Sequence, residues 1–392
     1  MNIAIIQESI DPKRGGAETS TLEMAARLAE LGPHVCVVHG GGETPVEIAA
    51  ARPMLEFAGL RSDSASRFWR ARRFVAAVDE FLKQRRFDIV HSVVPVRSCD
   101  VYQPRGGTYG EMIRRSLALS RSPWARSLRA MGRRLNLRQQ YLLRVEAAML
   151  NSPKPPMVAC LSEYVRRQVR FDFPDFPAER TRIVLNGVDV APLNDDERSN
   201  RAARFRAEHQ LAADTPVIAF IAHHFKLKGL RELIAACALP AVRASGAICL
   251  VAGRGDASSY ERQALALGIA GRIRFLGSGS SIRDLLAATD VLAHPTWYDP
   301  CSRVVLEALL LGVPVVTTVW NGASDVITPE VGRVIDSPGN VPELAAAIVQ
   351  MLGFEPRWAT RAAEERLGAV ISMRRHAKAL MSLYELVQES RR

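Results

Sequence analysis

The chain lacks the features that identify zinc-binding, secreted or membrane-spanning proteins. Its six cysteines are widely spaced with no Cys-x-x-Cys pair, and Cys36, Cys160 and Cys249 lie in apolar, strand-like runs where a thiol packs as a small hydrophobe. This predicts a reducing compartment and no zinc site. No stretch reaches the roughly 18 uncharged apolar residues that span a bilayer, and the first residues lack the basic and long apolar segments of a signal peptide. We therefore expect a cytoplasmic protein.

Cofactor motifs are also scarce. The turn after the first predicted strand contains Gly15-Gly16 but not Gly-x-Gly-x-x-Gly, the spacing that a nicotinamide cofactor needs. Gly253-Arg254-Gly255 has the first two glycines of that motif and lacks the third. Either turn can be a tight strand-to-helix connection. His223 and His224 are adjacent and would point in opposite directions in an extended chain, so we predict no metal site.

A regular alternation of strand and helix patterns runs along the chain. At 392 residues and 48% hydrophobic content, the chain fits two α/β domains. The alternation is typical of βαβ units on a parallel sheet. We predict domains at residues 1–188 and 189–370, with a helical segment 371–392 packing back on the first. The expected strands are 3–7, 35–39, 88–91, 157–161 and 182–185, then 217–221, 247–252, 272–276, 291–293, 313–317 and 331–335.

Basic residues are in excess and gather in one segment. The chain has 52 basic and 41 acidic side chains, a formal charge of +11, which indicates an anionic partner. From Arg105 to Arg144 there are ten arginines and one acid, Glu111, with leucines interleaved. A basic amphipathic helix of this kind is typical of segments that lie on an anionic membrane. A solvated helix that packs its leucines on the first domain is the alternative, and no recognition module favours nucleic acid.

Two lysines lie where a predicted helix follows the strand at 217–221. Lys226 and Lys228 precede Gly229, where the helix is expected to begin. Cations at a helix N-terminus oppose the helix dipole unless an anion sits between them. Phosphate is the favoured interpretation, and a solvated charge pair is the alternative. Gly15-Gly16 could likewise admit a phosphate to a helix N-terminus.

An acid pair follows the strand predicted at 291–293. Asp299 lies in a polar loop, and Glu307 lies eight positions later inside the next helix. The carboxyl ends of parallel strands border the ligand crevice of α/β folds, so two acids could hold separate groups of one extended ligand. Glu307 has apolar neighbours, and a buried carboxylate needs hydrogen-bond donors such as sugar hydroxyls. A helix-capping role for Asp299 and a surface position for Glu307 are the alternatives.

These residues resemble the signature of glycosyltransferase family 4, the retaining GT-B group. The family pattern is an acid, seven residues and Glu-Ala, followed by Gly-x-Pro-Val, which here are Asp299, Glu307-Ala308 and Gly312-Val313-Pro314-Val315. The resemblance covers nearly the whole chain, and the basic segment with residues 294–318 looks most like the lipopolysaccharide core glucosyltransferases. Further matches are Lys228-Gly229, Asn186-Gly187-Val188-Asp189, Asn321-Gly322 and Gly15-Gly16.

The resemblance implies a fold, an activity and residue roles. The fold would be GT-B, two Rossmann-like doubly wound domains with a cleft between them. The enzyme would transfer a hexose, with retention, from a nucleoside diphosphate sugar, expected to be UDP-linked, to a lipid-linked, lipopolysaccharide or other cell-envelope glycan, without a metal or other cofactor. Asp299 would hold the transferred sugar, Glu307 the ribose, and Lys228 with Lys226 the diphosphate. The remaining donor-binding residues would be Gly15, Gly16, His223, Gly253, Cys301, Ser302, Arg303 and Val304.

The chain departs from the family pattern at three places. Asp299 is one methylene shorter than the usual Glu, and His223 replaces the arginine usual five positions before the phosphate lysine. The histidine-glycine pair of the acceptor loop is not evident, and Asp100, Arg105 and His91 are the candidates to replace it. We add Asp100 to the predicted catalytic residues Asp299, Glu307 and Lys228.

The basic segment is predicted to contact the acceptor or the membrane. The residues assigned to this contact are Arg105, Arg114, Arg115, Arg133 and Arg134. This implies peripheral association with the inner face of the cytoplasmic membrane. A GT-B nucleotide-sugar epimerase and a non-catalytic protein that binds sugar nucleotides or membranes are the alternative functions.

Overall fold

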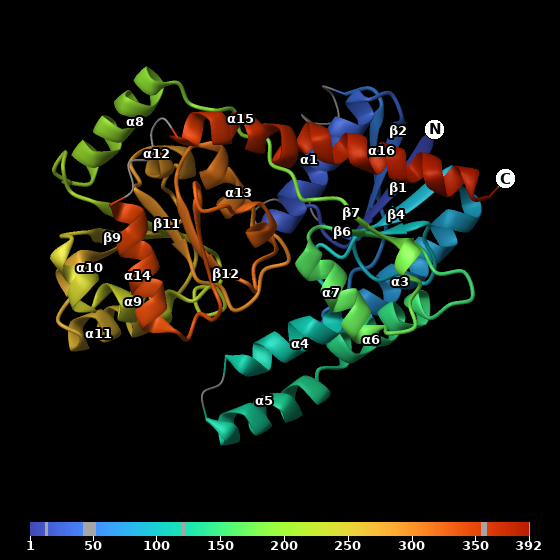
Figure 1. Ribbon diagram of the computed structural model, residues 1–392. Coiled ribbons are helices and arrows are strands. Elements are labelled where there is room, and N and C mark those ends of the chain that lie inside the picture. The colour runs from blue at the N-terminus through green and yellow to red at the C-terminus, as the bar shows by residue number, and fades with distance from the viewer. Residues whose placement is uncertain (12–14, 42–51, 120–121, 354–358, 392) are drawn as a thin grey trace. The chain divides into compact units, whose positions relative to one another are not determined.

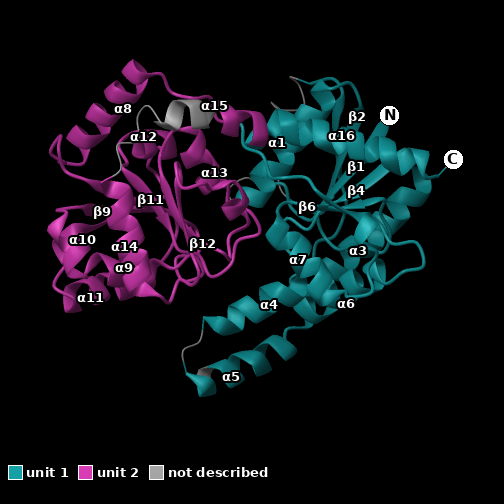
Figure 2. Ribbon diagram, viewed as in Figure 1, with its two compact units in different colours: residues 1–189, 371–392 teal, residues 190–370 magenta. Residues whose placement is uncertain are grey.

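The protein divides into two compact units. Unit 1 comprises residues Met1–Asp189 and Ile371–Arg392, and unit 2 comprises Val190–Val370 (Figure 2). The computed structural model describes the whole chain except residues 12–14, 42–51, 120–121, 354–358 and 392. The division follows Asp189, one residue beyond the boundary expected from the sequence.

Unit 1 contains a seven-stranded parallel sheet in the order β3-β2-β1-β4-β5-β6-β7. Its interior strand β1 has five consecutive buried residues, as expected for a parallel strand that helices cover on both faces. The strands are β1 Asn2–Gln7, β2 His34–His39, β3 Leu55–Gly59, β4 Ile89–Ser92, β5 Val101–Tyr102, β6 Met157–Cys160 and β7 Thr181–Ile183.

Unit 2 repeats the same arrangement with six parallel strands, in the order β10-β9-β8-β11-β12-β13. Across each sheet, the first four strands of the unit lie in the order 3-2-1-4, counted along the chain. This is the order of a doubly wound dinucleotide-binding sheet. The six strands overlap the six predicted ones. They are β8 Val217–Ile221, β9 Ile248–Ala252, β10 Ile273–Gly277, β11 Val291–His294, β12 Val315–Thr318 and β13 Gly332–Ile335.

Helices connect the strands and cover both sheets (Figure 1). In the described part of the chain, none of them is both long and apolar enough to cross a membrane. Unit 1 contains α1 Gly16–Glu30, α3 Arg67–Gln84, α4 Tyr109–Ala118, α5 Pro123–Arg134, α6 Leu137–Leu150, α7 Glu163–Asp172 and α16 Met373–Glu389. The helices of unit 2 are α8 Asp195–Glu208, α9 Leu230–Cys237, α10 Pro240–Ala244, α11 Ser258–Ala266, α12 Ile282–Ala287, α13 Arg303–Leu310 and α14 Val341–Leu352, and α15 Ala359–Ile371 leads back to unit 1.

The last helix, α16, is part of the unit 1 core. Met373, Ala377, Leu380 and Tyr384 are fully buried among residues of β1, β2 and α1. Burial of such side chains contributes about 1.5–3 kcal/mol each for the larger ones, so the C-terminal helix is integral to this unit.

The basic segment folds as three helices and not as the single amphipathic helix suggested by its composition. Thr108 caps α4 by accepting from Glu111 N, Pro123 occupies the first turn of α5, and Asn136 caps α6 by accepting from Gln139 N. Such capping residues and a proline end one helix and start the next. The helix α5 packs against α4 and α6, on their far side from the sheet in Figure 1.

A buried acid anchors this segment to the sheet. Glu146 of α6 accepts hydrogen bonds from the Tyr102 hydroxyl at 2.7 Å and from the Tyr109 amide at 2.9 Å, so it joins β5 to the start of α4. Burial raises the pKa of Glu146 to about 7, against the lowering effect of these two donors. The carboxyl group therefore titrates near neutral pH in the folded protein.

This raised pKa predicts that Glu146 makes stability fall as pH rises. Between the unfolded pKa of about 4.3 and the folded value of about 7, the folded state binds more protons than the unfolded state, so stability decreases with pH over that window. Glu146→Gln can still accept from the Tyr109 amide with its oxygen and can donate its N–H to the Tyr102 hydroxyl, so it should match the wild type at pH 5 and be more stable at pH 8. Urea unfolding at both pH values measures this. Parallel pH profiles for the two proteins would contradict it.

Candidate active site

The predicted phosphate lysine and the loop acid lie at the centre of the unit 2 sheet. Lys228 follows β8 and Asp299 follows β11, and these two strands are hydrogen-bonded neighbours at the point where the strand order reverses. Ligands of open α/β sheets bind outside the carboxyl ends of the strands at this position. The fold therefore brings together two residues that are 71 positions apart in sequence.

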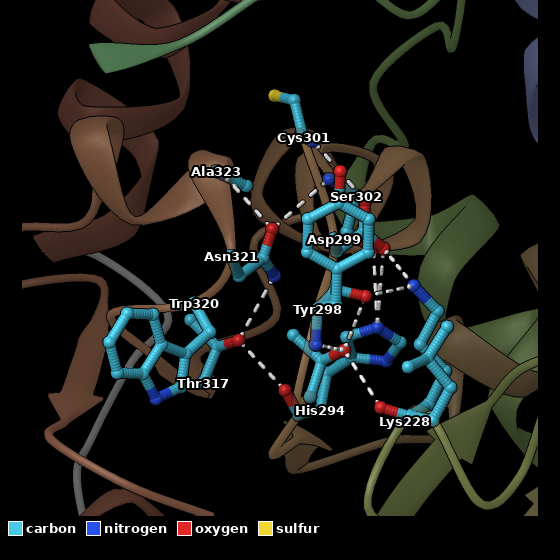
Figure 3. A network of polar contacts seen from close by, with 12 residues as sticks. Lys228, His294, Tyr298, Asp299, Cys301, Ser302, Thr317, Trp320, Asn321 and Ala323 are labelled. Atoms are coloured by element: carbon cyan, nitrogen blue, oxygen red, sulfur yellow. Dashed lines mark hydrogen bonds and ion pairs between the residues drawn. The ribbon is translucent and has the colours of Figure 1, made fainter. Parts of the chain in front are cut away.

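Lys228 and Asp299 form a largely buried ion pair. The ammonium Nζ of Lys228 lies 2.6 Å from Oδ2 of Asp299 and also donates to the Tyr298 carbonyl at 3.0 Å (Figure 3). The two side chains are 17% and 14% exposed. Burial alone would raise the pKa of Asp299, but the Lys228 ammonium and His294 hold it well below its ordinary value. Asp299 is therefore ionised at neutral pH.

A close approach of two backbones holds the lysine beside the acid. Gly229 has φ 82°, and a Cβ there would lie 2.0 Å from the Pro295 carbonyl oxygen, so only glycine fits. The Trp297 amide donates to the Leu227 carbonyl at 2.9 Å. The turn that carries Lys228 is thus fixed against the loop that carries Asp299.

His294, which the sequence argument did not single out, is the third member of this cluster. It ends β11, is 1% exposed, and stacks on Phe220 of β8 with ring centroids 6.1 Å apart. Its Nε2 lies 3.7 Å from Asp299 Oδ2 and 3.4 Å from Ser302 Oγ. The sequence feature that could have pointed to His294 is a histidine at the end of an otherwise apolar strand.

Two amides predicted to bind phosphate are occupied by side chains of the protein. The Cys301 amide donates to Asp299 Oδ1 at 3.2 Å, and the Ser302 amide donates to Asn321 Oδ1 at 3.1 Å (Figure 3). Asn321 also accepts from the Ala323 amide and donates to Thr317. Both amides are therefore engaged within the protein, and the predicted role of Cys301 and Ser302 in phosphate binding stays a prediction.

Glu307 lies on α13 and has an arginine neighbour one turn earlier. Its Oε1 accepts from Arg303 Nη2 at 3.1 Å, and the two side chains are 16% and 15% exposed. Val304 lies between them in sequence and is half-buried. Glu307 is thus neither a solvated surface acid nor fully enclosed.

The other predicted donor residues differ in exposure. His223 and Lys226 are exposed in the turn after β8. Gly253 has φ 124°, and a Cβ there would lie 1.8 Å from the Ala222 carbonyl oxygen, so backbone packing already requires this glycine. In unit 1, α1 begins at Gly16 with Gly15 as its N-cap.

The candidates for the acceptor-loop histidine are engaged elsewhere in unit 1. Asp100 directly precedes β5, at the amino-terminal edge of the sheet and opposite the edge where such folds bind ligands. Its carboxylate accepts from the Val90 amide at 2.7 Å and pairs with Arg391. This placement contradicts a catalytic role for Asp100. His91 is fully buried, with Nδ1 2.6 Å from the Tyr384 hydroxyl.

Three of the five arginines assigned to membrane contact are held within the protein. Arg105 is 7% exposed and donates to Ser20 and Asn186, so it cannot reach a membrane surface. Arg114 pairs with Glu111 and Asp172, and Arg115 pairs with Glu111 at 2.6 Å. The assignment of Arg105 to the membrane is therefore wrong, whereas that of Arg114 and Arg115, whose side chains are 38% and 20% exposed, stays a prediction.

The helix α5 has a different surface. Four large apolar side chains are exposed at spacings of four, three and four residues, which places them on one helical face. They are Trp124 (83% exposed), Leu128 (63%), Met131 (56%) and Leu135 (73%). Arg126 and Arg134 are exposed on the same helix, and residues 122–138 contain no acid.

Two family models match the chain, one in each half. The model for "Glycosyltransferase Family 4" matches residues 14–192, and the model for "Glycosyl transferases group 1" matches residues 202–363. The chain belongs to glycosyltransferase family 4.

Relatives of this family 4 chain include a lipopolysaccharide enzyme. The lipopolysaccharide glucosyltransferase WaaG of Escherichia coli is 23% identical over 353 residues, which cover 89% of this chain and 90% of WaaG. An uncharacterized glycosyltransferase of Methanocaldococcus jannaschii is 26% identical over 220 residues, but the match spans only 56% of that protein and 54% of this chain.

Solved structures show that this family 4 chain has the GT-B fold. The crystal structure of WaaG gives a TM-score of 0.71 at 22% identity and covers 99% of this chain and 98% of WaaG. The structure of Anabaena HepE in complex with UDP and glucose gives a TM-score of 0.70 at 19% identity. The match covers 98% of this chain and 99% of HepE. The prediction of two Rossmann-like sheets in a GT-B protein is confirmed.

Proposed function

We propose that the protein is a retaining glycosyltransferase that moves a hexose from a UDP-linked sugar to a lipid-linked, lipopolysaccharide or other cell-envelope glycan. The observation that carries this proposal is the Lys228–Asp299 pair at the switch point of the unit 2 sheet. A lysine at this edge attracts a diphosphate, and a carboxylate beside it accepts hydrogen bonds from sugar hydroxyls. A nucleoside diphosphate sugar contains both groups in one molecule.

Donor binding would rearrange the charges of this pair. In the described structure the ammonium of Lys228 donates hydrogen bonds to the Asp299 carboxylate and the Tyr298 carbonyl. A diphosphate near Lys228 would share this ammonium, and Asp299 would turn toward the hydroxyls of the transferred sugar. Lys226, exposed in the same turn, would add a second cation. Glu307, beside Arg303 on α13, would accept from the ribose hydroxyls.

Catalysis in this proposal is electrostatic. As the bond from the sugar C1 to the diphosphate breaks, negative charge builds on the leaving diphosphate; the acceptor hydroxyl oxygen bonds to C1, and its proton passes to an oxygen of that leaving group. Donors fixed beforehand at that position stabilise the transition state more than the ground state. Lys228, braced through Gly229 against the loop after β11, is such a donor. No metal or other cofactor is needed in this scheme.

The acceptor part of the proposal rests on α5 and on the relatives. WaaG is described as a lipopolysaccharide glucosyltransferase, and Rhizobium meliloti LpsE, 32% identical over 168 residues, as a lipopolysaccharide core biosynthesis glycosyltransferase. An exposed helix with an apolar face and arginines suits the surface of an anionic membrane. We propose that α5 docks the enzyme peripherally on the cytoplasmic leaflet, where a lipid-linked acceptor is presented.

A thermal-shift screen of nucleotide sugars tests the donor proposal. A UDP-hexose at about 100 times its dissociation constant should add roughly 2.7 kcal/mol to the free energy of unfolding. The lysines supply the positive charge, so EDTA should not reduce the shift. A transferase should release UDP when an acceptor is present, an epimerase should convert the sugar of the nucleotide sugar, and a non-catalytic binding protein should do neither. No shift with any nucleotide sugar, or a shift that EDTA abolishes, would contradict the proposal.

A further inference from the structure

His294 is a buried polar side chain that the proposed chemistry does not yet use. It lies at the end of an apolar strand whose other residues, Val291, Leu292 and Ala293, are fully buried. Leaving a buried nitrogen without a hydrogen bond costs about 1–3 kcal/mol. An apolar residue would avoid this cost and would still stack on Phe220. The histidine at this position therefore requires an explanation.

The surroundings of the ring favour one tautomer. Nε2 faces two oxygens, Asp299 Oδ2 at 3.7 Å and Ser302 Oγ at 3.4 Å. Nδ1 has no hydrogen-bond partner among the residues that the structure describes. Placing the single proton on Nε2 leaves an acceptor, and not a donor, on the apolar side. Burial lowers the pKa of His294 despite the opposing effect of Asp299, so the ring is neutral at pH 7.

We infer that His294 is a positioning residue that holds the Asp299 carboxylate when Lys228 turns to the diphosphate. The inference rests on the proposed function, because Asp299 contacts the sugar only in that scheme. In the described structure Lys228, in the turn after β8, and His294, at the end of β11, both approach Asp299 Oδ2. When the donor shares the ammonium of Lys228, Nε2–H of His294 becomes the donor that keeps this carboxylate aimed at the sugar.

The main chain around His294 is fixed well enough to support this role. Its carbonyl oxygen accepts from Thr317 Oγ1 at 2.7 Å and from the Thr296 amide at 2.8 Å. The loop that carries Asp299 is fixed in turn, since the Asp299 amide donates to the Trp320 carbonyl at 2.9 Å. Because the His294 backbone is hydrogen-bonded and its ring stacks on Phe220, the ring can orient the Asp299 carboxylate while staying in place.

Calorimetric binding of UDP and UDP-glucose to matched variants tests the inference. His294→Phe keeps the stacked ring but has no Nε2–H, so it should bind UDP-glucose about tenfold more weakly, since a hydrogen bond to a charged group is lost, while UDP binding is unchanged. His294→Gln, which restores an N–H donor, should recover most of the loss. Leu292→Val, a packing change on the same strand, should leave the ratio of the two affinities at its wild-type value.

One binding result would overturn the inference and another would overturn the proposed function. If His294→Phe keeps the wild-type ratio of the UDP-glucose affinity to the UDP affinity, even with both affinities weakened, His294 does not position Asp299. If the wild type binds neither UDP nor UDP-glucose, the proposed donor is wrong. A ligand-free measurement separates these cases. In the nitrogen-15 spectrum of histidine-labelled protein, the signals lost in His294→Phe should show a neutral ring protonated on Nε2 and should shift in Asp299→Asn. A proton on Nδ1 would overturn the inference whatever the donor.

Discussion

Asp299→Ala should lower the turnover of sugar transfer by at least about a hundredfold while leaving the affinity for UDP nearly intact. In the proposed scheme Asp299 contacts the transferred sugar and not the nucleotide, so its loss removes an interaction with the reacting group. Removal of one preorganised polar partner from an active site costs about 10²–10³ in kcat. Steady-state kinetics with UDP-glucose and calorimetry with UDP measure the two quantities.

The ion pair with Lys228 makes a second variant necessary. Asp299→Ala leaves a largely buried ammonium without its carboxylate, and removal of one partner from a buried pair costs up to about 3–5 kcal/mol. Asp299→Asn keeps the shape and an oxygen for Lys228, so it should be more stable than the alanine variant and still inactive. Wild-type turnover by a folded Asp299→Asn protein would contradict the role of the carboxylate.

Glu307→Ala is the matched comparison for this prediction. Contact with the ribose does not depend on the transferred sugar, so this variant should weaken binding of UDP itself as well as lower turnover. Arg303, its partner at 3.1 Å, would lose an ion pair in the same variant. Arg303→Ala, which breaks that pair and keeps the acid, separates the two effects. Equal losses of UDP affinity in the Asp299 and Glu307 alanine variants would show that the division of roles is wrong.

The sheet of unit 2 could be predicted from the sequence because most of its strands are apolar runs between turn residues, although β10 and β13 each include an arginine and a glycine. Unit 1 was harder. β5 has only two residues, Val101–Tyr102, and β3 (Leu55–Gly59) mixes an acid and a glycine with its apolar residues, so neither strand was expected. The basic segment was expected as one helix because its composition is uniform, whereas local caps at Thr108 and Asn136 divide it.

The sequence predicted Asp299, Glu307 and Lys228 as site residues, but it did not show that Asp299 contacts both Lys228 and His294. Asp299 and Glu307 lie in one short segment, so their spacing was visible. The contact of Asp299 with Lys228 depends on β8 and β11 being adjacent, which no local pattern shows. Asp100 was misassigned because the sequence did not reveal that β5 begins at the next residue, which places this acid at the wrong edge of the sheet.

Reversing the charge of two exposed arginines on α5 should release the protein from anionic vesicles. Each basic residue near such a surface contributes about 1 kcal/mol, so Arg126→Glu with Arg134→Glu should weaken binding by at least roughly thirtyfold. The attraction is screened over about 10 Å at 0.1 M salt, so the wild type should bind less at high salt. Sedimentation with phosphatidylglycerol-containing and pure phosphatidylcholine vesicles measures both effects.

The apolar face of α5 should contribute independently of salt. Trp124 and Leu128 are 83% and 63% exposed, and aromatic side chains favour the headgroup region of a bilayer. Replacing both with serine should reduce binding at low and high salt alike.

Controls in unit 2 have the same chemistry at other exposed positions: Arg231→Glu with Arg262→Glu for charge, and Leu265→Ser for apolar exposure. These should bind vesicles like the wild type, and all variants should keep their affinity for UDP-glucose because none of the substituted positions is a predicted donor-binding residue. Equal loss in the control variants would assign the attraction to net charge alone, and a wild type that stays in the supernatant with anionic vesicles at low salt would favour a soluble acceptor.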